Sequence, residues 1–249
     1  MGLETIGIVG FGQFGAFLAD LAGRYRPAAR VRVASGHLPP EDPRVFPLAE
    51  VCASDLVLLA VPIRTFEARL AEVVPLLGPA SVVVDVATVK VHTVEALGRL
   101  APGRRWIATH PMFGPYSYEK QGGSLEGLRV VVADHSLGAA DYQAAKAALA
   151  AAGLVVQEMA PAAHDRMLAE TLFLTHYVGQ IVHHGDFERT NIDSVSFGFL
   201  MDAVESVRQD VRLFQDVYRF NPYCRDVVRR FERAEQEVAR LLEAARGAG

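Results

Sequence analysis

The sequence predicts an α/β domain with a doubly wound, mainly parallel sheet, followed by an all-α domain. Short apolar and β-branched runs alternate with longer Ala- and Leu-rich stretches up to residue 158, which is the pattern of parallel strands joined by crossover helices. From residue 159 onward no strand-like run follows, and the apolar residues recur at helical spacing. We therefore expect two domains, over residues 1–158 and 159–249.

Seven strands are predicted in the first domain. They are Ile6–Val9, Val31–Ala34, Leu56–Val61, Ser81–Asp85, Trp106–Ala108, Leu128–Ala133 and Leu154–Gln157. The helices expected between them are Gln13–Arg24, Phe66–Leu77, Val89–Leu100 and Ala139–Ala151. The Leu56–Val61 run is almost wholly apolar, as expected for a strand that is covered on both faces.

Three helices are predicted in the second domain, at Asp165–His183, Phe197–Tyr218 and Asp226–Ala245. The last carries an apolar stripe at helical spacing, made of Val227, Val228, Phe231, Ala234, Val238, Leu241 and Leu242. A stripe of this kind usually marks packing between helices. Because the stripes are wide for so small a domain, we expect a second subunit to cover part of them in a homodimer.

Composition restricts the classes of partner. The net charge of −4 gives no electrostatic reason to expect a nucleic acid. The two cysteines, Cys52 and Cys224, are too few for a disulfide framework or a zinc cluster. No apolar run is long enough to cross a bilayer, and no segment like a signal peptide precedes the first strand. We expect a cytoplasmic protein that binds a small molecule, with no metal, nucleic-acid or membrane partner.

A G-x-G-x-x-G motif, Gly10 to Gly15, follows the first predicted strand and opens the first predicted helix. In this strand–turn–helix setting the motif predicts a Rossmann dinucleotide site. The first glycine permits a tight turn, the second leaves room for a pyrophosphate, and the third lets the helix pack closely on the strand. The helix N-terminus then offers N–H groups to the phosphates. The residues expected to bind the cofactor are Gly10, Gly12, Gln13, Phe14, Gly15, Ser35, His37 and Val61.

The end of the second predicted strand bears on the identity of the cofactor. An NAD site usually places Asp or Glu there to bind the ribose 2′-hydroxyl, but this chain has Ser35-Gly36-His37. Ser35 can donate a hydrogen bond to a 2′-phosphate, and no carboxylate is present to repel one. We therefore favour NADP, with NAD as the alternative.

Two segments should meet at the carboxyl edge of the sheet, where doubly wound folds bind their ligands. Asp85–Lys90 leaves one predicted strand, and Thr109–Pro115 leaves the next. His110 at such a strand exit is well placed to take a proton from a substrate hydroxyl, because the ordinary pKa of imidazole is about 6.5. These features together predict a nicotinamide-dependent dehydrogenase.

Several segments resemble the prephenate/arogenate (cyclohexadienyl) dehydrogenase family, in particular its plant-type arogenate branch. His110–Pro115, with the sequence HPMFGP, is similar to the family's signature. Asp85–Lys90 resembles a D-x-x-S-V-K segment of the family, with Thr88 in place of serine. His164-Asp165, followed by Thr175-His176, is similar to the HD…H pattern that opens the family's helical domain.

The resemblance implies an oxidative decarboxylation in tyrosine biosynthesis. His110 accepts a hydrogen bond from the C4 hydroxyl of the substrate, hydride passes to the cofactor, and the ring carboxylate leaves as carbon dioxide. Thr88 hydrogen-bonds the same hydroxyl or the imidazole, so His110 and Thr88 are the expected catalytic residues. Gly114, His176 and Asp210 are the expected substrate-binding residues.

The chain departs from many bacterial members of this family at one position. Glu205 falls where those members carry an arginine that binds the substrate carboxylate, and Arg208 and Arg212 are the nearby candidates for that contact. Asp210 matches an acidic position of the arogenate branch. A carboxylate there would pair with the ammonium of arogenate and lack a partner in prephenate, a difference of about 1–3 kcal/mol. We therefore favour arogenate as the substrate.

Three other interpretations fit parts of the pattern. One is a different dehydrogenase of similar layout, such as a β-hydroxyacid dehydrogenase or an imine reductase. Another is a relative that acts on an amino-substituted prephenate. The third is a non-catalytic sensor that binds NADP, which predicts cofactor binding without turnover and has no need of a proton acceptor such as His110.

Overall fold

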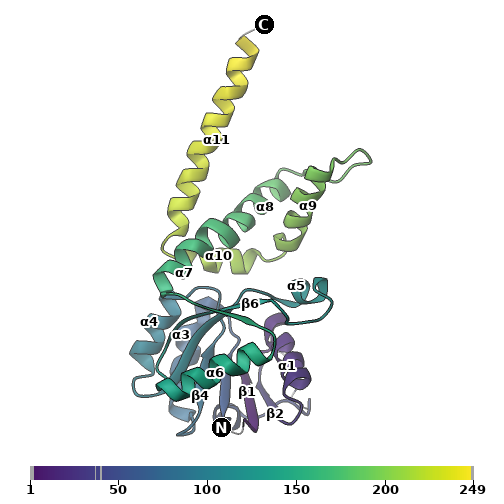
Figure 1. The fold of residues 1–249 in the computed structure, drawn as a ribbon. Helices are drawn as coiled ribbons and strands as arrows, with labels where there is room; N and C mark the ends of the chain where they lie inside the picture. Colours follow the sequence, from purple (N-terminus) through teal and green to yellow (C-terminus); the bar gives the residue numbers. More distant parts are fainter. Residues whose placement is uncertain (1–2, 37, 40, 248–249) are drawn as a thin grey trace. The chain divides into compact units, whose positions relative to one another are not determined.

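The computed structural model describes residues 3–36, 38–39 and 41–247, and the chain divides into two compact units after His164. The first unit contains a seven-stranded sheet in the order β2-β1-β3-β4-β5-β6-β7 (Figure 1). Its strands are β1 (Thr5–Val9), β2 (Arg30–Ala34), β3 (Leu56–Leu59), β4 (Val82–Asp85), β5 (Arg105–Pro111), β6 (Arg129–His135) and β7 (Val155–Glu158). The predicted doubly wound α/β fold is thereby confirmed. The boundary predicted after residue 158 stays a prediction.

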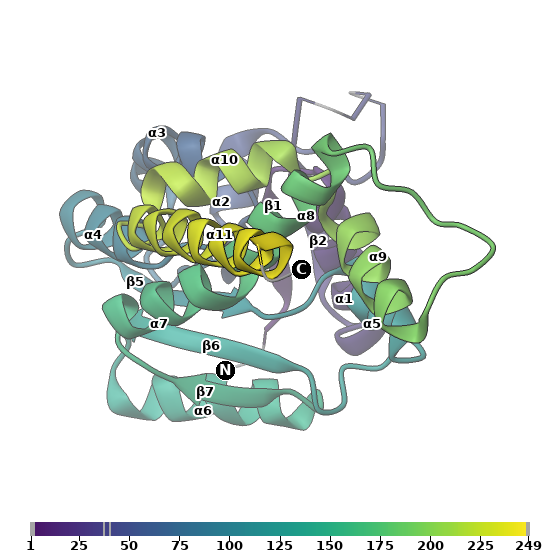
Figure 2. The ribbon, with the colours of Figure 1, turned by 90° about the horizontal axis from the view of Figure 1, so that it is seen from above.

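All neighbouring strands are parallel except β5 and β6, which run antiparallel. The helices of this unit are α1 (Gln13–Tyr25), α2 (Leu48–Cys52), α3 (Phe66–Val73), α4 (Val91–Leu100), α5 (Pro115–Lys120) and α6 (Ala139–Ala151). Helix α6 packs beside β7 (Figure 2). Parallel strands need such crossover helices, so the sheet is covered on its faces as the apolar strands predict.

The core explains why the central strands read as continuous apolar runs. On one face, Val57 and Val83 of neighbouring strands pack with Phe66 and Leu70 of α3 and Leu97 of α4, and none of these five side chains is exposed to solvent. A second cluster, which includes Ile8, Leu58 and Ala19, covers the other face against α1. Each such side chain contributes about 1.5–3 kcal/mol to stability through burial. The central strands thus hold the ends of β1, β3 and β4 in fixed positions.

Strand β5 is longer than the sequence predicts. The expected strand ended at Ala108, but the observed strand continues to Pro111, so His110 lies inside a strand and not beyond its exit. The extension pairs with β6, where His110 lies opposite Val131 and Pro111 opposite Val130. The extension is stabilised by its antiparallel neighbour β6. The sequence analysis assumed parallel strands, so it did not predict this pairing.

The second unit contains only helices among its described residues. Its elements are α7 (Pro161–Leu168, which begins before the division), a π-helical turn (Ala169–Phe173), α8 (Leu174–His184), α9 (Val195–Val207), α10 (Val211–Phe220) and α11 (Cys224–Gly247). The single helix predicted at 197–218 is wrong, because α9 ends at Val207. The Gln180 side chain donates hydrogen bonds to the carbonyl oxygens of Val207 and Arg208, at 3.4 and 3.2 Å. These bonds satisfy carbonyls at the end of α9 that a continuing helix would have paired.

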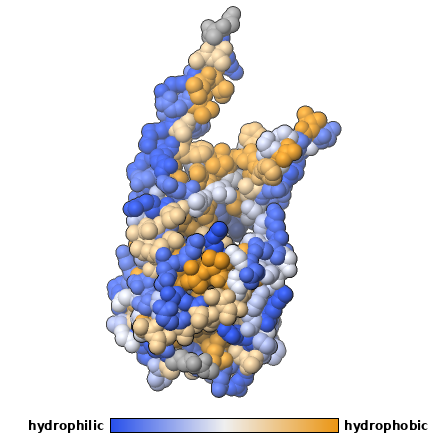
Figure 3. Space-filling view, in the orientation of Figure 1, coloured by the Kyte–Doolittle hydropathy of each residue, from blue (hydrophilic) through white to orange (hydrophobic). Residues whose placement is uncertain are grey.

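Helix α11 presents apolar side chains to solvent along its second half. Val238, Leu241 and Leu242 are 54%, 71% and 65% exposed, and the apolar surface is visible along the upper part of this helix in Figure 3. Large apolar side chains gathered in this way usually mark an interaction surface. Within the described residues, no helix is both long and apolar enough to cross a membrane.

Candidate active site

The glycine turn between β1 and α1 has the geometry that the motif predicts. Gly10 adopts a positive φ of 97°, and a Cβ atom there would lie 2.3 Å from the carbonyl oxygen of Ala60. A Cβ at Gly15 would lie 2.2 Å from the carbonyl oxygen of Gly10. At Gly12, in contrast, no protein atom lies within 4 Å of a Cβ position. The first and third glycines are therefore required by the fold, whereas the second faces open space that a pyrophosphate can fill.

The first turn of α1 is suited to anion binding. Gly12 is the N-cap residue, and no side chain caps this helix end. Gln13 is exposed and Phe14 is half-buried at the start of the helix. The backbone N–H groups of a helix N-terminus attract phosphate through hydrogen bonding and through the helix dipole. The turn thus offers backbone N–H groups to the phosphates of a dinucleotide.

The predicted cofactor residues on the neighbouring strands lie at the same edge of the sheet. Ser35 follows β2 and is half-buried, and the backbone N–H of Gly10 donates to the carbonyl of Ala34 at 2.9 Å. Val61 follows β3, and its side chain would touch a Cβ at Gly10. His37 lies outside the described residues. Two of the predicted positions, Ser35 and Val61, therefore lie beside the glycine turn.

Arg44 also lies beside this turn, although the sequence analysis did not select it. Its backbone carbonyl accepts from the N–H of Val33 on β2 at 2.7 Å, and its guanidinium lies over the ring of Phe11, 5.0 Å from the centroid. The guanidinium pairs through Nε and Nη2 with Asp42, and this hydrogen bond lowers the pKa of Asp42 to about 2. Arg32, by contrast, donates to the carbonyl of Glu50 on α2. Arg44 is positioned by backbone hydrogen bonds between its segment and Val33 of β2, and no sequence pattern marks these bonds.

A fully buried ion pair joins the ends of β4 and β5. The Lys90 ammonium donates to the carboxylate of Asp85 and, at 2.7 Å, to the backbone carbonyl of Thr109. Both charged side chains have zero solvent exposure. The other carboxylate oxygen of Asp85 accepts from the N–H of Ala87 at 2.8 Å, and the Thr109 hydroxyl donates to the Asp85 carbonyl at 2.7 Å. This network holds Thr109 in place and thereby fixes the backbone of the next residue, His110.

His110 is buried, at 5% exposure, and contacts a second histidine. Its Nδ1 lies 2.9 Å from Nε2 of His164 at the start of α7, and the two rings meet edge to face. Burial holds the pKa of His110 well below its ordinary value of 6.5, and nearby His164 and Lys90 lower it further. His110 is consequently a neutral imidazole near pH 7, the state that can accept a proton. His164 was noted in the sequence only as part of the HD pattern.

The other predicted residues of this unit have less definite surroundings. Thr88 is half-buried in the loop between β4 and α4, two positions before Lys90. Gly114 is the N-cap residue of α5, and its N–H donates to the Ser117 hydroxyl at 2.9 Å. Their roles toward a substrate stay predictions.

The helical unit brings two predicted substrate residues together. His176 on α8 is 5% exposed, and Nδ1 of its ring has no hydrogen-bond partner among the described residues. Burial lowers the pKa of His176, and the carboxylate of Asp210 at the start of α10 opposes that shift. An unpaired polar atom at a buried position is costly, by about 1–3 kcal/mol. A polar atom of a bound ligand could form the missing hydrogen bond to Nδ1 of His176.

Glu205 is not available as a free carboxylate. It accepts from Arg189 at 2.9 Å, and Arg189 also pairs with Asp202 at 2.7 Å. Arg208 and Arg212, the candidates for the carboxylate contact, are both exposed. Arg189 was missed because its partners lie more than ten positions away in the chain.

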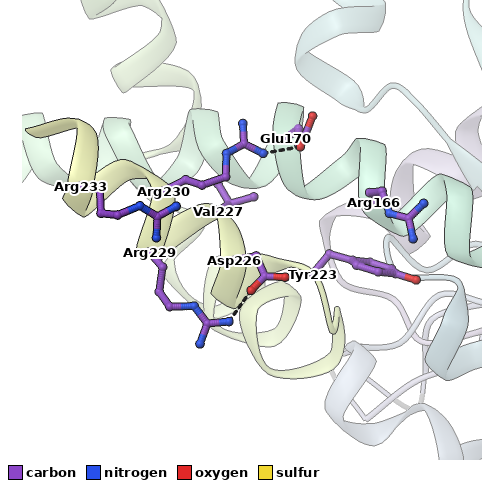
Figure 4. A pocket seen from close by; sticks show the side chains of 8 residues that line it. All are labelled: Arg166, Glu170, Tyr223, Asp226, Val227, Arg229, Arg230 and Arg233. Carbon is purple, nitrogen blue, oxygen red and sulfur yellow. Dashed lines mark hydrogen bonds and ion pairs between the residues drawn. The ribbon is translucent and has the colours of Figure 1, made fainter.

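A separate pocket of about 380 Å³ lies in the helical unit beside α7 and α11 (Figure 4). It is lined by Arg166, Glu170, Tyr223, Asp226, Val227, Arg229, Arg230 and Arg233. Two of its arginines are paired with acids, Arg230 with Glu170 at 2.5 Å and Arg229 with Asp226. None of the catalytic, substrate-binding or cofactor-binding residues predicted from the sequence lines this pocket, which is therefore separate from the candidate active site.

The ion pair beneath His110 yields a stability prediction. Lys90→Met leaves the Asp85 carboxylate buried without its partner and should lower the free energy of unfolding by about 3–5 kcal/mol. The double variant Asp85→Asn/Lys90→Met removes both charges and should recover most of that loss, since the amide still accepts from Ala87. Urea unfolding followed by circular dichroism measures both. Equal destabilisation by the single and double variants would contradict a buried-charge penalty.

Comparison with known proteins agrees with this geometry. The sequence profile of the family "Prephenate dehydrogenase, nucleotide-binding domain" matches residues 29–156. Arogenate dehydrogenase 1, chloroplastic, of Arabidopsis thaliana is 26% identical over 262 residues, which cover 95% of this chain but 39% of the relative. Arogenate dehydrogenase 2, chloroplastic, of the same plant is 27% identical over 95% of this chain and 69% of its own length. The chain thus spans well under half of the first of these relatives.

A solved structure shares the fold along nearly the whole chain. Prephenate dehydrogenase from A. aeolicus, in complex with hydroxyphenyl propionate and NAD+, superimposes with a TM-score of 0.74 at 20% identity. The match covers 97% of this chain and 91% of the other. The profile match includes β4, the Asp85–Lys90 network and His110 on β5. On the strength of that match over more than half of its length, the chain belongs to the prephenate dehydrogenase family.

Proposed function

We propose that this chain catalyses the oxidative decarboxylation of arogenate, with hydride transfer to a nicotinamide dinucleotide, in tyrosine biosynthesis. The observation that carries the proposal is the buried, neutral His110 held against His164 at 2.9 Å. A proton acceptor of this kind is what an alcohol oxidation requires beside a nicotinamide. The named relatives, which are arogenate dehydrogenases, support the same reaction class.

The residues of the chain divide the work of this reaction. The turn from Gly10 to Gly15 binds the dinucleotide, whose nicotinamide ring accepts the hydride when it is bound. His110 Nε2 accepts a hydrogen bond from the C4 hydroxyl of the substrate and takes its proton as hydride leaves C4. Loss of the ring carboxylate as carbon dioxide then leaves its electron pair in the ring, which becomes an aromatic phenolate, and the phenolate oxygen takes the proton back from His110. Aromatisation drives the reaction. Thr88 contributes a hydroxyl near the same atoms.

His176 and Asp210 favour arogenate over prephenate. The unpaired Nδ1 of His176 is suited to a polar group of the substrate, and the Asp210 carboxylate lies near enough to His176 to affect its pKa. A carboxylate attracts the ammonium group of arogenate and lacks a partner in the keto group of prephenate. We propose a cytoplasmic location for this chain, whereas the plant relatives are named as chloroplastic proteins.

The direct test combines substrates, cofactors and pH. Purified protein should reduce NADP most rapidly with arogenate, as followed by absorbance of the reduced nicotinamide, and His110→Asn should lower kcat by about 10²–10⁴-fold.

Since only neutral His110 accepts the proton and burial lowers its pKa, the rate should stay constant as the pH falls through 6.5 and decline only below that value. A decline that begins above pH 6.5 would contradict this role. Cofactor binding without turnover would favour the sensor interpretation.

Arg44 provides a test of the NADP preference. Its guanidinium lies on Phe11 within the glycine turn and beside the strand that ends at Ser35. A charge-assisted hydrogen bond to a 2′-phosphate contributes about 1.5–3 kcal/mol, so Arg44→Ala should raise the KM for NADP by about tenfold or more. The KM for NAD should change by less than about twofold. Arg32→Ala is the matched control, because Arg32 contacts Glu50 instead. Equal loss with both cofactors would exclude the 2′-phosphate role.

The exposed stripe of α11 favours a homodimer. Val238, Leu241 and Leu242 expose more than half of their surface on one helix, and a second copy of the same helix can cover them through a two-fold axis. Light scattering should give about twice the 27.0 kDa of one chain. Leu241→Asp should yield a monomer, whereas Leu76→Asp, at an exposed apolar position of the first unit, should not. A 27.0 kDa particle for the unaltered chain would refute the dimer.

A further inference from the structure

The contact between His110 and His164 joins two elements of the first unit. His110 lies on β5, and His164 lies in the first turn of α7, where its backbone N–H donates to the carbonyl of Ala160 at 3.0 Å. Both side chains are at most 5% exposed, the ring centroids are 5.1 Å apart, and the ring planes cross at 81°. Neither ring can rotate without breaking the Nδ1–Nε2 contact or displacing its buried neighbours. The pair is therefore a fixed arrangement and not a surface encounter.

A hydrogen bond between Nδ1 of His110 and Nε2 of His164 has two possible proton arrangements. In one, Nδ1–H of His110 donates to Nε2 of His164, and Nε2 of His110 keeps its lone pair. In the other, Nε2–H of His164 donates to Nδ1 of His110, and Nε2 of His110 carries a hydrogen. Only the first arrangement leaves His110 able to accept a proton from a substrate hydroxyl.

We infer that His164 is a positioning residue that accepts the Nδ1–H of His110 and so presents the Nε2 lone pair of His110 to the substrate hydroxyl. The inference rests on the proposed function for the identity of the reacting group. It assigns to His164 the task that a carboxylate performs beside many catalytic histidines, namely selection of the tautomer and of the ring orientation.

The surroundings of His110 explain why an imidazole suits this task. Lys90, from the loop between β4 and α4, is a cation that acts on His110, and its charge is paired with the carboxylate of Asp85. His164 is the titratable group that faces His110 from α7, and Val131 lies opposite on β6. A carboxylate at position 164 would favour the imidazolium and raise the pKa of His110. The imidazole of His164 fixes the tautomer without adding that negative charge.

Three substitutions at position 164 separate positioning from packing. His164→Phe keeps the ring but cannot accept, so kcat should fall at least about tenfold while KM stays within about threefold. His164→Gln places an amide oxygen within reach of Nδ1–H and should keep kcat within about fivefold of the unaltered chain. His164→Asp should move the acidic limb of the pH–rate profile to higher pH. His183→Phe, at an exposed histidine on α8, is the control and should leave all three quantities unchanged.

A nitrogen-15 NMR spectrum of the imidazoles tests the inference without any substrate. At pH 7 the unaltered chain should show His110, assigned by its loss in His110→Asn, protonated at Nδ1 and unprotonated at Nε2. His164→Phe should shift His110 toward the Nε2–H tautomer. Nε2–H in the unaltered chain would overturn the inference, as would a His164→Phe protein with unchanged kcat and tautomer. If no substrate pair is turned over, the proposed function fails while the spectrum still decides the role of His164.

Discussion

The buried ion pair of Lys90 and Asp85 is the constraint on which the rest of the site depends. Two charges without solvent are stable only when every polar neighbour is satisfied, and here the pair also binds the Ala87 N–H and the Thr109 carbonyl. These contacts tie the end of β4 to the end of β5 through a loop that has no regular hydrogen bonding of its own. The backbone of His110 is held by the same network. The charge of Lys90 also disfavours protonation of that imidazole, so one interaction serves both structure and chemistry.

The nucleotide side of the site depends on a different constraint, close contact between backbones. Gly10 and Gly15 lie so near other carbonyl oxygens that no side chain fits, whereas Gly12 faces open space. Glycine is thus required at positions 10 and 15 by the packing of the fold. At position 12 we propose that it leaves room for the dinucleotide. Arg44, carried beside β2 by a short ladder, adds the positive charge that the strand end lacks.

The helical unit contributes a buried polar atom that the described residues leave unpaired, Nδ1 of His176. Asp210 lies at the start of α10, where the chain turns, and its charge acts on His176. That turn exists because Gln180 satisfies the last carbonyls of α9, which allows the chain to reverse before α10. In our proposal, Nδ1 of His176 is the group in this unit that a polar substrate would pair.

The sequence by itself determined the alternation of strands and helices, the glycine turn and the segment around His110, because periodicity and glycine spacing are local properties of the chain. It did not determine that β5 extends through His110, that α9 ends at Val207, or that His164 lies against His110, 54 positions away. Each of these depends on a contact between segments distant in sequence: antiparallel pairing with β6, a side chain donated from α8, and a ring from α7. Local propensity carries no information about such partners, so only the tertiary structure decided them.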